Sequence, residues 1–246
     1  MGEFMDNYLD EYEEGYSTTN QHWIDNQLSM EWYPRRIIEI SASTGNESLL
    51  DLGLGHGKTT DFFDNFFRDY EVIEGSSLFI KKYQIENPES KIIFHNCFFE
   101  DFNSPKKWDL IIMGYILEHV KDPDLILKKY ADFLNPGGAI YIVVPNAESL
   151  HRRIGYEAGL LNDLFKLSND DLMFGHQRYF TVKTLTDFVH SHNLKITRIE
   201  GIFIKPITSQ QIRKLELSSE ILMGMCKVGI EYPELSNSIL MEIKKK

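Results

Sequence analysis

The stretch LLDLGLGHGKTT, residues 49–60, decides the fold of this chain. It begins with an apolar run of the kind that forms a buried parallel strand. It then passes through glycines at alternate positions, and glycine lets the backbone approach a ligand closely. A helical pattern follows, in which Phe62 pairs with Phe66 and Phe63 with Phe67. Strand, glycine turn and helix predict the first half of a nucleotide-binding βαβ unit.

The glycine spacing departs from the dinucleotide-binding fingerprint G-x-G-x-x-G. The third glycine would have to stand where the sequence has Lys58, and an acid, Asp51, precedes the first glycine. A pyrophosphate prefers a bare helix N-terminus, whereas an acid before the turn suits an ammonium group or hydroxyls. The pattern D-x-G-x-G-x-G resembles the first motif of the class I S-adenosylmethionine (SAM)-dependent methyltransferases. A turn that only connects a strand to a helix is the alternative for this motif alone.

A second acid follows in the next strand of the sequence pattern. The stretch of residues 70–76 contains this predicted strand, which ends in the acid Glu74 and is followed by Gly75 and Ser76. The interval from Asp51 to Glu74 matches one helix and one strand. A carboxylate at this point can accept both hydroxyls of an adenosine ribose. The two acids together are more specific for an adenosine cofactor than either acid alone.

The third predicted strand, residues 92–95, leads into an aromatic loop. The resemblance implies that this loop holds the adenine, by apolar contacts and a hydrogen bond to its amino group. Phe98, Phe99 and Glu100 are the candidates. The alternative for the two phenylalanines is that they pack in the core, as this residue type commonly does.

A fourth strand at residues 108–113 is followed by GYILEHV, residues 114–120, and by Asp122-Pro123. This segment closely resembles the LEHv-DP segment of the methyltransferase family. The turn NPGG, residues 135–138, before a fifth strand at residues 139–144 is also typical of the family. The resemblance implies an α/β, Rossmann-like fold with a mostly parallel seven-stranded sheet in the order 3-2-1-4-5-7-6. Helices flank this sheet, and its last strand is antiparallel.

We expect a single methyltransferase domain over residues 1–246, with no internal boundary. Residues 1–4 look like a vector scar. Residues 5–48 form an N-terminal arm or lid, and residues 147–180 form an insertion at the acceptor site. The part of this insertion from residue 160 to residue 174 is expected to be rich in helix.

The remaining elements are predicted from periodicity and from helix signals. Pro34 can start a helix over residues 35–40, because proline is favoured in the first helical turn. Residues 194–203 predict the sixth strand, residues 212–228 one long helix, and residues 238–243 the antiparallel last strand.

Large aromatic residues gather before the first strand. Tyr8, Tyr12, Tyr16 and Trp23 are candidates for a lid that covers a bound ligand. Their alternative role is to pack on the core. The sequence gives these two interpretations equal support.

Composition limits the classes of partner. The net charge is −11 and the pI about 5.2, which argues against a nucleic-acid partner, because phosphate contacts need clustered Lys and Arg. No apolar run reaches membrane length, and no signal peptide is visible. Cys97 and Cys226 are too few for a disulfide framework and lack metal-ligand spacing, so we expect a cytoplasmic protein without a metal. A homodimer is compatible with the sequence.

The cofactor implied by the resemblance is SAM, with S-adenosyl-L-homocysteine (SAH) as its product. Asp51 and the glycine backbone suit its amino acid end, Glu74 its ribose and residues 98–100 its adenine. The full set of expected cofactor-binding residues is Asp51, Gly53, Gly55, Glu74, Gly75, Ser76, Phe98, Phe99, Glu100, Gly114, Tyr115, Tyr12, Tyr16 and Trp23.

Histidines follow the fourth and fifth strands, at the edge of the sheet where ligands bind in such folds. His119, His151 and His176 are the candidates for a catalytic base, because histidine can take a proton near neutral pH. A packing or capping role is the alternative for each of them. His119 is the first candidate, because it lies just past the fourth strand.

Arginines beside these histidines suggest an acceptor that carries a phosphate. Arg152, Arg153 and Arg178 could bind phosphate or carboxylate oxygens through their guanidinium groups. Their segments also resemble a subgroup of small-molecule methyltransferases from sugar, capsule and natural-product pathways. The sequence therefore predicts O-methylation of a nucleotide-linked sugar, in polysaccharide or capsule biosynthesis.

Three other functions stay open. An N-methyltransferase on an amino sugar or another small amine would need no base, provided that the amine is neutral. A non-catalytic SAM-binding subunit would share the cofactor motifs. A nicotinamide-dependent dehydrogenase or epimerase is disfavoured by Lys58, which stands in place of the third glycine of the dinucleotide-binding fingerprint.

Overall fold

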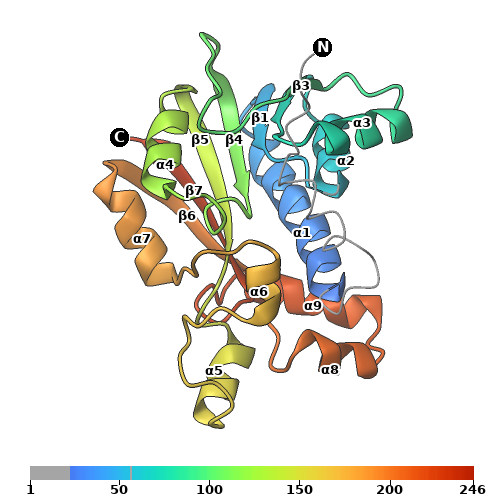
Figure 1. Ribbon diagram of the computed structural model, residues 1–246, viewed down its shortest axis with the longest axis vertical. Helices are drawn as coiled ribbons and strands as arrows, with labels where there is room; N and C mark the ends of the chain where they lie inside the picture. Colours follow the sequence, from blue (N-terminus) through green and yellow to red (C-terminus); the bar gives the residue numbers. More distant parts are fainter. Residues whose placement is uncertain (1–22, 56) are drawn as a thin grey trace.

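A central sheet in the order β3-β2-β1-β4-β5-β7-β6 organises the computed structural model (Figure 1). The model describes residues 23–55 and 57–246. Strands β1 to β5 pair in parallel, and β7 pairs antiparallel with both β5 and β6. The predicted Rossmann-like fold and its strand order are therefore confirmed. The strands are β1 (Ser48–Leu52), β2 (Asp69–Ile73), β3 (Ile93–His95), β4 (Trp108–Gly114), β5 (Leu134–Pro145), β6 (Leu194–Ile202) and β7 (Ser238–Lys245).

Helices cover both faces of this sheet. In Figure 1, α4 and α7 lie to the left of the sheet, and α1, α2 and α3 lie to its right. The described helices are α1 (Trp23–Ser41), α2 (Lys58–Asp64), α3 (Ser77–Glu86), α4 (Pro123–Ala131), α5 (Leu150–Glu157), α6 (Asn169–Met173), α7 (Val182–Ser191), α8 (Ser209–Lys214) and α9 (Ser219–Gly229). None of these helices combines the length and the apolar character needed to cross a membrane.

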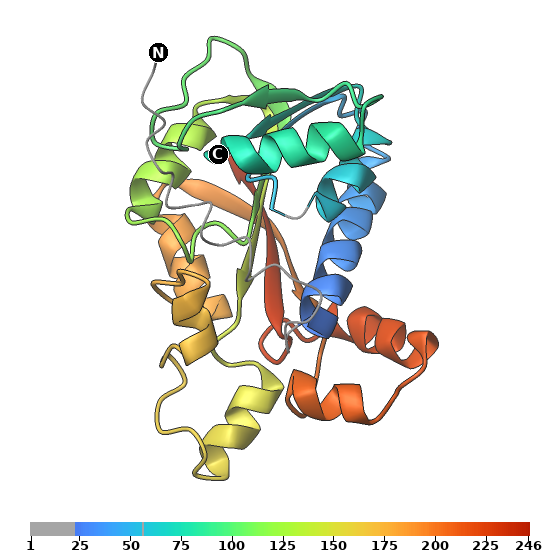
Figure 2. The same cartoon turned by 45° about the vertical axis from the view of Figure 1, so that its right-hand side comes forward.

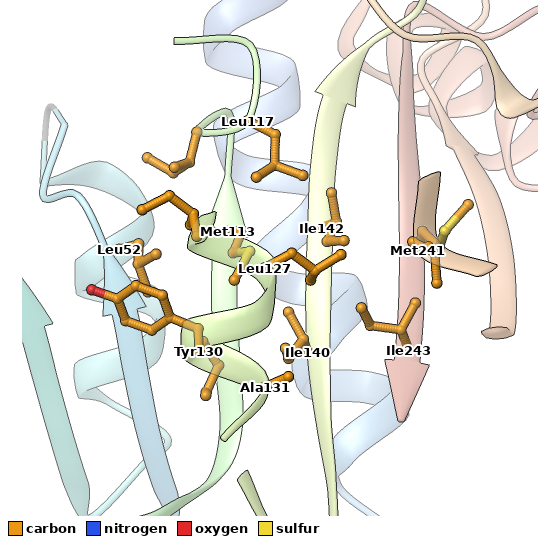
Figure 3. Packing of buried hydrophobic residues seen from close by; sticks show 14 of the residues in the cluster. Leu52, Met113, Leu117, Leu127, Tyr130, Ala131, Ile140, Ile142, Met241 and Ile243 are labelled. Atoms are coloured by element: carbon orange, nitrogen blue, oxygen red, sulfur yellow. The ribbon is translucent and has the colours of Figure 1, made fainter. Parts of the chain in front are cut away.

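The core consists of two apolar layers, one on each face of the sheet. Successive side chains of a strand point to opposite faces, so β5 sends Ile140 and Ile142 to one layer and Tyr141 and Val143 to the other. The first layer includes Tyr130 and its neighbours on α4, packed against β4, β5 and β7 in Figure 3. Burial on both faces explains the near-continuous apolar runs of the central strands.

Three local predictions were wrong. Helix α1 does not start after Pro34 but continues through it from Trp23, while Tyr33 and Ile37 on either side are buried in the core. That packing offsets the hydrogen bond that proline cannot make. The predicted long helix over residues 212–228 is two helices, because Glu216 adopts a φ of 47° between α8 and α9.

The third correction concerns the insertion. Of residues 160–174, only Asn169–Met173 are helical, and this short α6 is held by a capping box between Ser168 and Asp171. Helix α5, directly after β5, supplies the other helical part of the insertion. Figure 2 shows α5 and α8 beyond the end of the sheet where β5 runs into α5. This end is the carboxyl edge of the parallel strands.

A pair of glycine substitutions tests the packing of β6 against α9. In Gly201→Ala, the new Cβ would overlap Oγ of Ser236 and the carbonyl oxygen of Gly229, so we expect a loss of about 1–3 kcal/mol in the free energy of unfolding. Gly224→Ala is the matched control, because a Cβ on this α9 residue meets no atom within 4 Å. It should stabilise the helix by up to about 1 kcal/mol. Urea denaturation would measure both, and equal stability of the two variants would contradict this packing.

Candidate active site

A large cavity opens at the carboxyl edge of the sheet. Its volume is about 1160 Å³, which is large enough for a cofactor and an acceptor together. Segments that follow β1, β2, β4 and β5 line it, together with parts of the insertion and of α8. The fold therefore brings together residues that are far apart in the sequence.

The glycine turn after β1 forms one wall of the cavity. Gly53 and Gly55 both line it, with φ angles of 88° and 51° that favour glycine. The Gly53 amide donates to the carbonyl oxygen of Ile73 at 2.8 Å, which ties the turn to the end of β2. A Cβ on Gly53 would lie 3.2 Å from the side chain of Ile116. The turn thus keeps its backbone open to the cavity, as the sequence predicted for a ligand-binding loop.

Glu74 lies just past β2 and also lines the cavity. Its carboxylate is 7% exposed and accepts the backbone amides of Leu54, at 3.0 Å, and of Ser76, at 2.7 Å. These bonds fix both oxygens and join the first two strand ends. Each oxygen of a carboxylate has two lone pairs and can accept more than one hydrogen bond. Glu74 is therefore placed to accept two neighbouring hydroxyls of a ligand.

Asp51 lies behind the cavity and does not line it. This residue is the last but one of β1 and is 2% exposed, and its Oδ2 accepts the hydroxyl of Tyr70 at 2.9 Å. Burial raises the pKa of the Asp51 carboxyl to about 7. Direct contact with a cofactor, which the motif suggested, would need a bridging group or a movement of this side chain. The sequence offered no signal for the Tyr70 partner.

The other expected cofactor residues divide into three groups. Residues 98–100 and the pair Gly114 and Tyr115 line the cavity, as does Gly75. Ser76 instead caps α3, where its side chain accepts the amide of Phe79 at 3.2 Å. The lid predictions for Tyr8, Tyr12 and Tyr16 fall outside the described residues, and so does the side chain of Trp23, although α1 begins there.

Two distant segments meet at a polar cluster in the cavity wall. Glu118 and His119 follow β4, and His176 lies after α6; all three line the cavity. The rings of His119 and His176 pack edge to face, with centroids 4.7 Å apart. Gln177 holds the two segments together, because its backbone amide donates to the Glu118 carbonyl at 2.8 Å and its side chain to the His119 carbonyl at 2.6 Å. We refer to Glu118, His119 and His176 as the cavity cluster.

Asp171 orients one member of the cavity cluster. Its carboxylate accepts the amide and hydroxyl of Ser168 in the α6 capping box, and the hydroxyl of Tyr179. Nδ1 of His176 lies 3.2 Å from the same carboxylate. Burial opposes a charge on His176, but Asp171 and then Glu118 outweigh it and raise the pKa of His176. The sequence gave no signal for this role of Asp171.

Burial shifts the pKa values of the two other cluster members. Burial raises the pKa of Glu118 to about 7, and neither of its carboxylate oxygens has a hydrogen-bond partner in the part of the chain that the structure describes. Burial, followed by the neighbouring His176, lowers the pKa of His119 to about 3. His119 is therefore neutral near pH 7, but it is a weak base. His151, the third predicted base, also lines the cavity, with its Nδ1 3.2 Å from the hydroxyl of Ser149.

The predicted substrate-binding arginines are mostly engaged within the protein. Arg178 donates to the carbonyls of Leu117, Val120 and Lys121 and does not line the cavity. Arg153, also outside the cavity lining, pairs with Glu148 at 3.2 Å. Arg178 therefore braces the loop after β4, and neither residue is placed to bind an acceptor.

Arg152 is the one of the three predicted arginines that lines the cavity. Its guanidinium lies over the ring of Tyr179 and donates to the carbonyls of Leu164 and Lys166, both at 2.8 Å. Part of its donor capacity therefore supports the loop of the insertion. The sequence could not reveal these carbonyl partners, because irregular loops supply them.

Comparison with known proteins identifies the family. A family model described as a methyltransferase domain matches residues 21–199. The chain belongs to this methyltransferase family. The resemblance to class I SAM-dependent methyltransferases is thereby confirmed.

Relatives of this methyltransferase are distant in sequence. Alpha N-terminal protein methyltransferase 1 of Dictyostelium discoideum is 32% identical over 100 residues, which cover 38% of this chain and 37% of the relative. The chain spans less than half the length of the curated relatives it matches.

Solved structures share the whole fold of the methyltransferase. A SAM-dependent methyltransferase from Clostridium acetobutylicum has a TM-score of 0.61 at 11% identity, over 97% of this chain and 99% of that chain. The N-methyltransferase NodS from Bradyrhizobium japonicum, in complex with SAH, has a TM-score of 0.61 at 12% identity, over 98% and 99% of the two chains. At these identities the likeness concerns the fold.

The raised pKa of Asp51 has a consequence for stability. The folded protein holds this proton more tightly than the unfolded chain, so the stabilising contribution is present at low pH and is lost as the pH rises from about 4 to about 7. Asp51→Asn removes this titration. As the pH rises from about 4 to about 8, we expect the free energy of unfolding of the variant to increase relative to that of wild type by on the order of 2–4 kcal/mol. Denaturant unfolding at both pH values measures this, and parallel pH profiles would contradict it.

Proposed function

We propose that this protein transfers the methyl group of SAM to a hydroxyl of a small-molecule acceptor, with a sugar or nucleotide-linked sugar as the first candidate. The observation that carries the proposal is the cavity cluster. Glu118, His119 and His176 gather ionisable groups in the same cavity that the glycine turn and Glu74 line, and these last two features suit an adenosine cofactor. A hydroxyl must lose its proton to accept a methyl group, and ionisable side chains promote this loss.

The cavity lining fits SAM. The bare backbone at Gly53 and Gly55 would receive the amino acid end, and Glu74 would accept the two ribose hydroxyls. Phe98 and Phe99 offer apolar surface for the adenine. SAM supplies an activated methyl group on a sulfonium leaving group. The residues of the chain therefore have to align donor and acceptor, exclude water and assist the acceptor proton.

The charges of the cavity bear on the acceptor. Its described lining contains the cations Lys58, Lys121, Arg152 and Lys205, but a larger number of carboxylates. A phosphate on the acceptor would therefore depend on these four cations, since Arg153 and Arg178 are engaged elsewhere. A comparison of the Michaelis constants of free and nucleotide-linked sugars would show whether a phosphate contributes to binding.

N-methylation is the second candidate. The acidic residues Asp170, Asp171 and Glu118 in the cavity lining would also suit a cationic amine. Two proteins similar to this chain are named for amine chemistry, the N-terminal protein methyltransferase and NodS. In this case an amine would have to reach the cavity as its neutral base before it accepts the methyl group.

Cofactor binding gives the first test. Glu74→Gln should weaken SAM binding by about 10- to 100-fold, because the amide presents only one acceptor oxygen and carries no charge. Glu86→Gln, on the exposed side of α3, is the control and should bind SAM as wild type does. Isothermal calorimetry with SAM, SAH and NAD would measure both. Binding of NAD without SAM would refute the proposed cofactor.

Product analysis gives the second test. Incubation with SAM and a panel of sugars, sugar nucleotides, amines and phenols should yield SAH and a methoxy product, detected by NMR. An N-methyl product would favour the second candidate. The absence of turnover with the whole panel would favour a SAM-binding subunit without activity.

The cavity cluster gives the third test. His176→Gln should lower the turnover number by about 10²–10⁴-fold if the cluster promotes proton loss. His192→Gln is the matched control, because His192 also pairs with a carboxylate, Asp124, but lies outside the cavity lining. If His151→Gln lowers turnover and His176→Gln does not, the base is His151 and the cluster has another role.

A further inference from the structure

We propose that the cavity cluster binds a divalent transition-metal ion. Glu118, His119 and His176 each offer one ligand atom, and these atoms all lie within 4.8 Å of one another. The sequence predicted no metal, because its ligands come from two segments with no recognisable metal-binding spacing. The site exists only once the fold brings the loop after β4 against the loop after α6.

The state of the Glu118 carboxylate is the first argument. This side chain is 0% exposed, and neither oxygen has a hydrogen-bond partner among residues 23–55 and 57–246. Buried polar groups are nearly always paired, because an unpaired buried carboxylate loses its hydration without compensation. A cation held between Glu118 and the two histidines would supply the missing partner.

The surroundings of His176 are the second argument. Metal-bound histidines usually hydrogen-bond their other ring nitrogen to a carboxylate, which fixes the ring and the tautomer. Nδ1 of His176 lies 3.2 Å from Asp171, within the distance of an ion pair, and the ring would have to rotate to form a hydrogen bond with this carboxylate. Asp171 is itself held by Ser168 and by Tyr179. This chain of contacts would leave Nε2 of His176 as the metal ligand.

The frame of the site is the third argument. The bonds from Gln177 to the carbonyls of Glu118 and His119 fix the two segments relative to each other. Arg178 adds bonds to the carbonyls of Leu117 and Lys121, on either side of the two ligands. A site built on such a frame loses little conformational entropy when an ion binds.

The donor set indicates the class of ion. Two imidazole nitrogens and one carboxylate oxygen suit Zn²⁺, Co²⁺, Mn²⁺ or Fe²⁺ better than Ca²⁺ or Mg²⁺, which prefer oxygen ligands. Bonds to such an ion are about 2.0–2.2 Å long, so neighbouring ligand atoms of a tetrahedral site lie about 3.3–3.6 Å apart. Ligand atoms that lie up to 4.8 Å apart would therefore have to approach one another by up to about 1.5 Å, through rotation of their side chains.

Three protein ligands leave coordination positions open toward the cavity. Such a position could take an oxygen of the acceptor and lower the pKa of its hydroxyl. This consequence rests on the proposed function, whereas the ion site itself rests only on the geometry of the cluster. Metal binding can therefore be tested without SAM or an acceptor.

The test uses the full chain after dialysis against a chelator. Calorimetry with Zn²⁺ and visible absorption with Co²⁺ should show one ion bound per chain, and excess Zn²⁺ should raise the melting temperature by about 5 °C. Glu118→Gln and His176→Gln should each weaken binding by at least about 100-fold. Asp171→Asn, which keeps all three ligands, should weaken it by about 10- to 100-fold.

Controls separate the ion site from general effects. His192→Gln should bind the ion as wild type does, because its histidine–carboxylate pair lies outside the cavity lining. Glu118→Gln without metal should melt no lower than wild type, since it removes a buried charge without a partner. The proposal is overturned if wild type binds no ion, or if all four variants bind it equally well. Retained methyl transfer after metal removal would refute the role of the ion in the reaction but not its binding.

Discussion

Burial of the parallel sheet on both faces is the constraint on which the rest of the structure depends. The central strands are covered by α4 and α7 on one side and by α1, α2 and α3 on the other, so their interiors must be apolar. Polar side chains can reach a ligand only where the strands end, even though single buried acids such as Asp51 also lie within them. The fold therefore concentrates Glu74, the glycine turn and the cavity cluster at one edge, and the long chain segments after β5 have only to enclose this edge.

Much of the fold could be predicted, because its signals are local. The apolar strand at residues 48–52, the glycine turn and the Asp122 cap of α4 each depend on neighbours in the sequence. The strand order followed from the resemblance of these motifs to a family. Glu74 was predicted for the same reason: a position directly after β2 fixes where its side chain lies. The break between α8 and α9 was missed, because the helical pattern of apolar residues continues across it. The backbone at Glu216, with its positive φ angle, is not helical.

The site was harder to predict, because its contacts join distant segments. Asp51 carries the motif but bonds to Tyr70 on the adjacent strand, a partner that spacing cannot show. Arg178 was predicted from its charge to bind an acceptor, yet loop carbonyls occupy its donors. Charge and residue type are visible in a sequence, but the competition between a ligand and the protein's own carbonyls is not. His176 was a candidate for the site because it is a histidine, whereas nothing near Asp171 in the sequence indicated that it would contact His176.

Glu118 also bears on how such an enzyme would evolve. Folding alone gains nothing from an acid that is fully enclosed and accepts no hydrogen bond from the described residues. An apolar residue of similar size would fit this position at lower free energy. Laboratory selection for heat resistance alone should therefore accept replacement of this residue early, whereas selection that also demands activity should not. If the cavity cluster acts in methyl transfer as proposed, position 118 separates these two pressures, as functional sites in natural proteins often do.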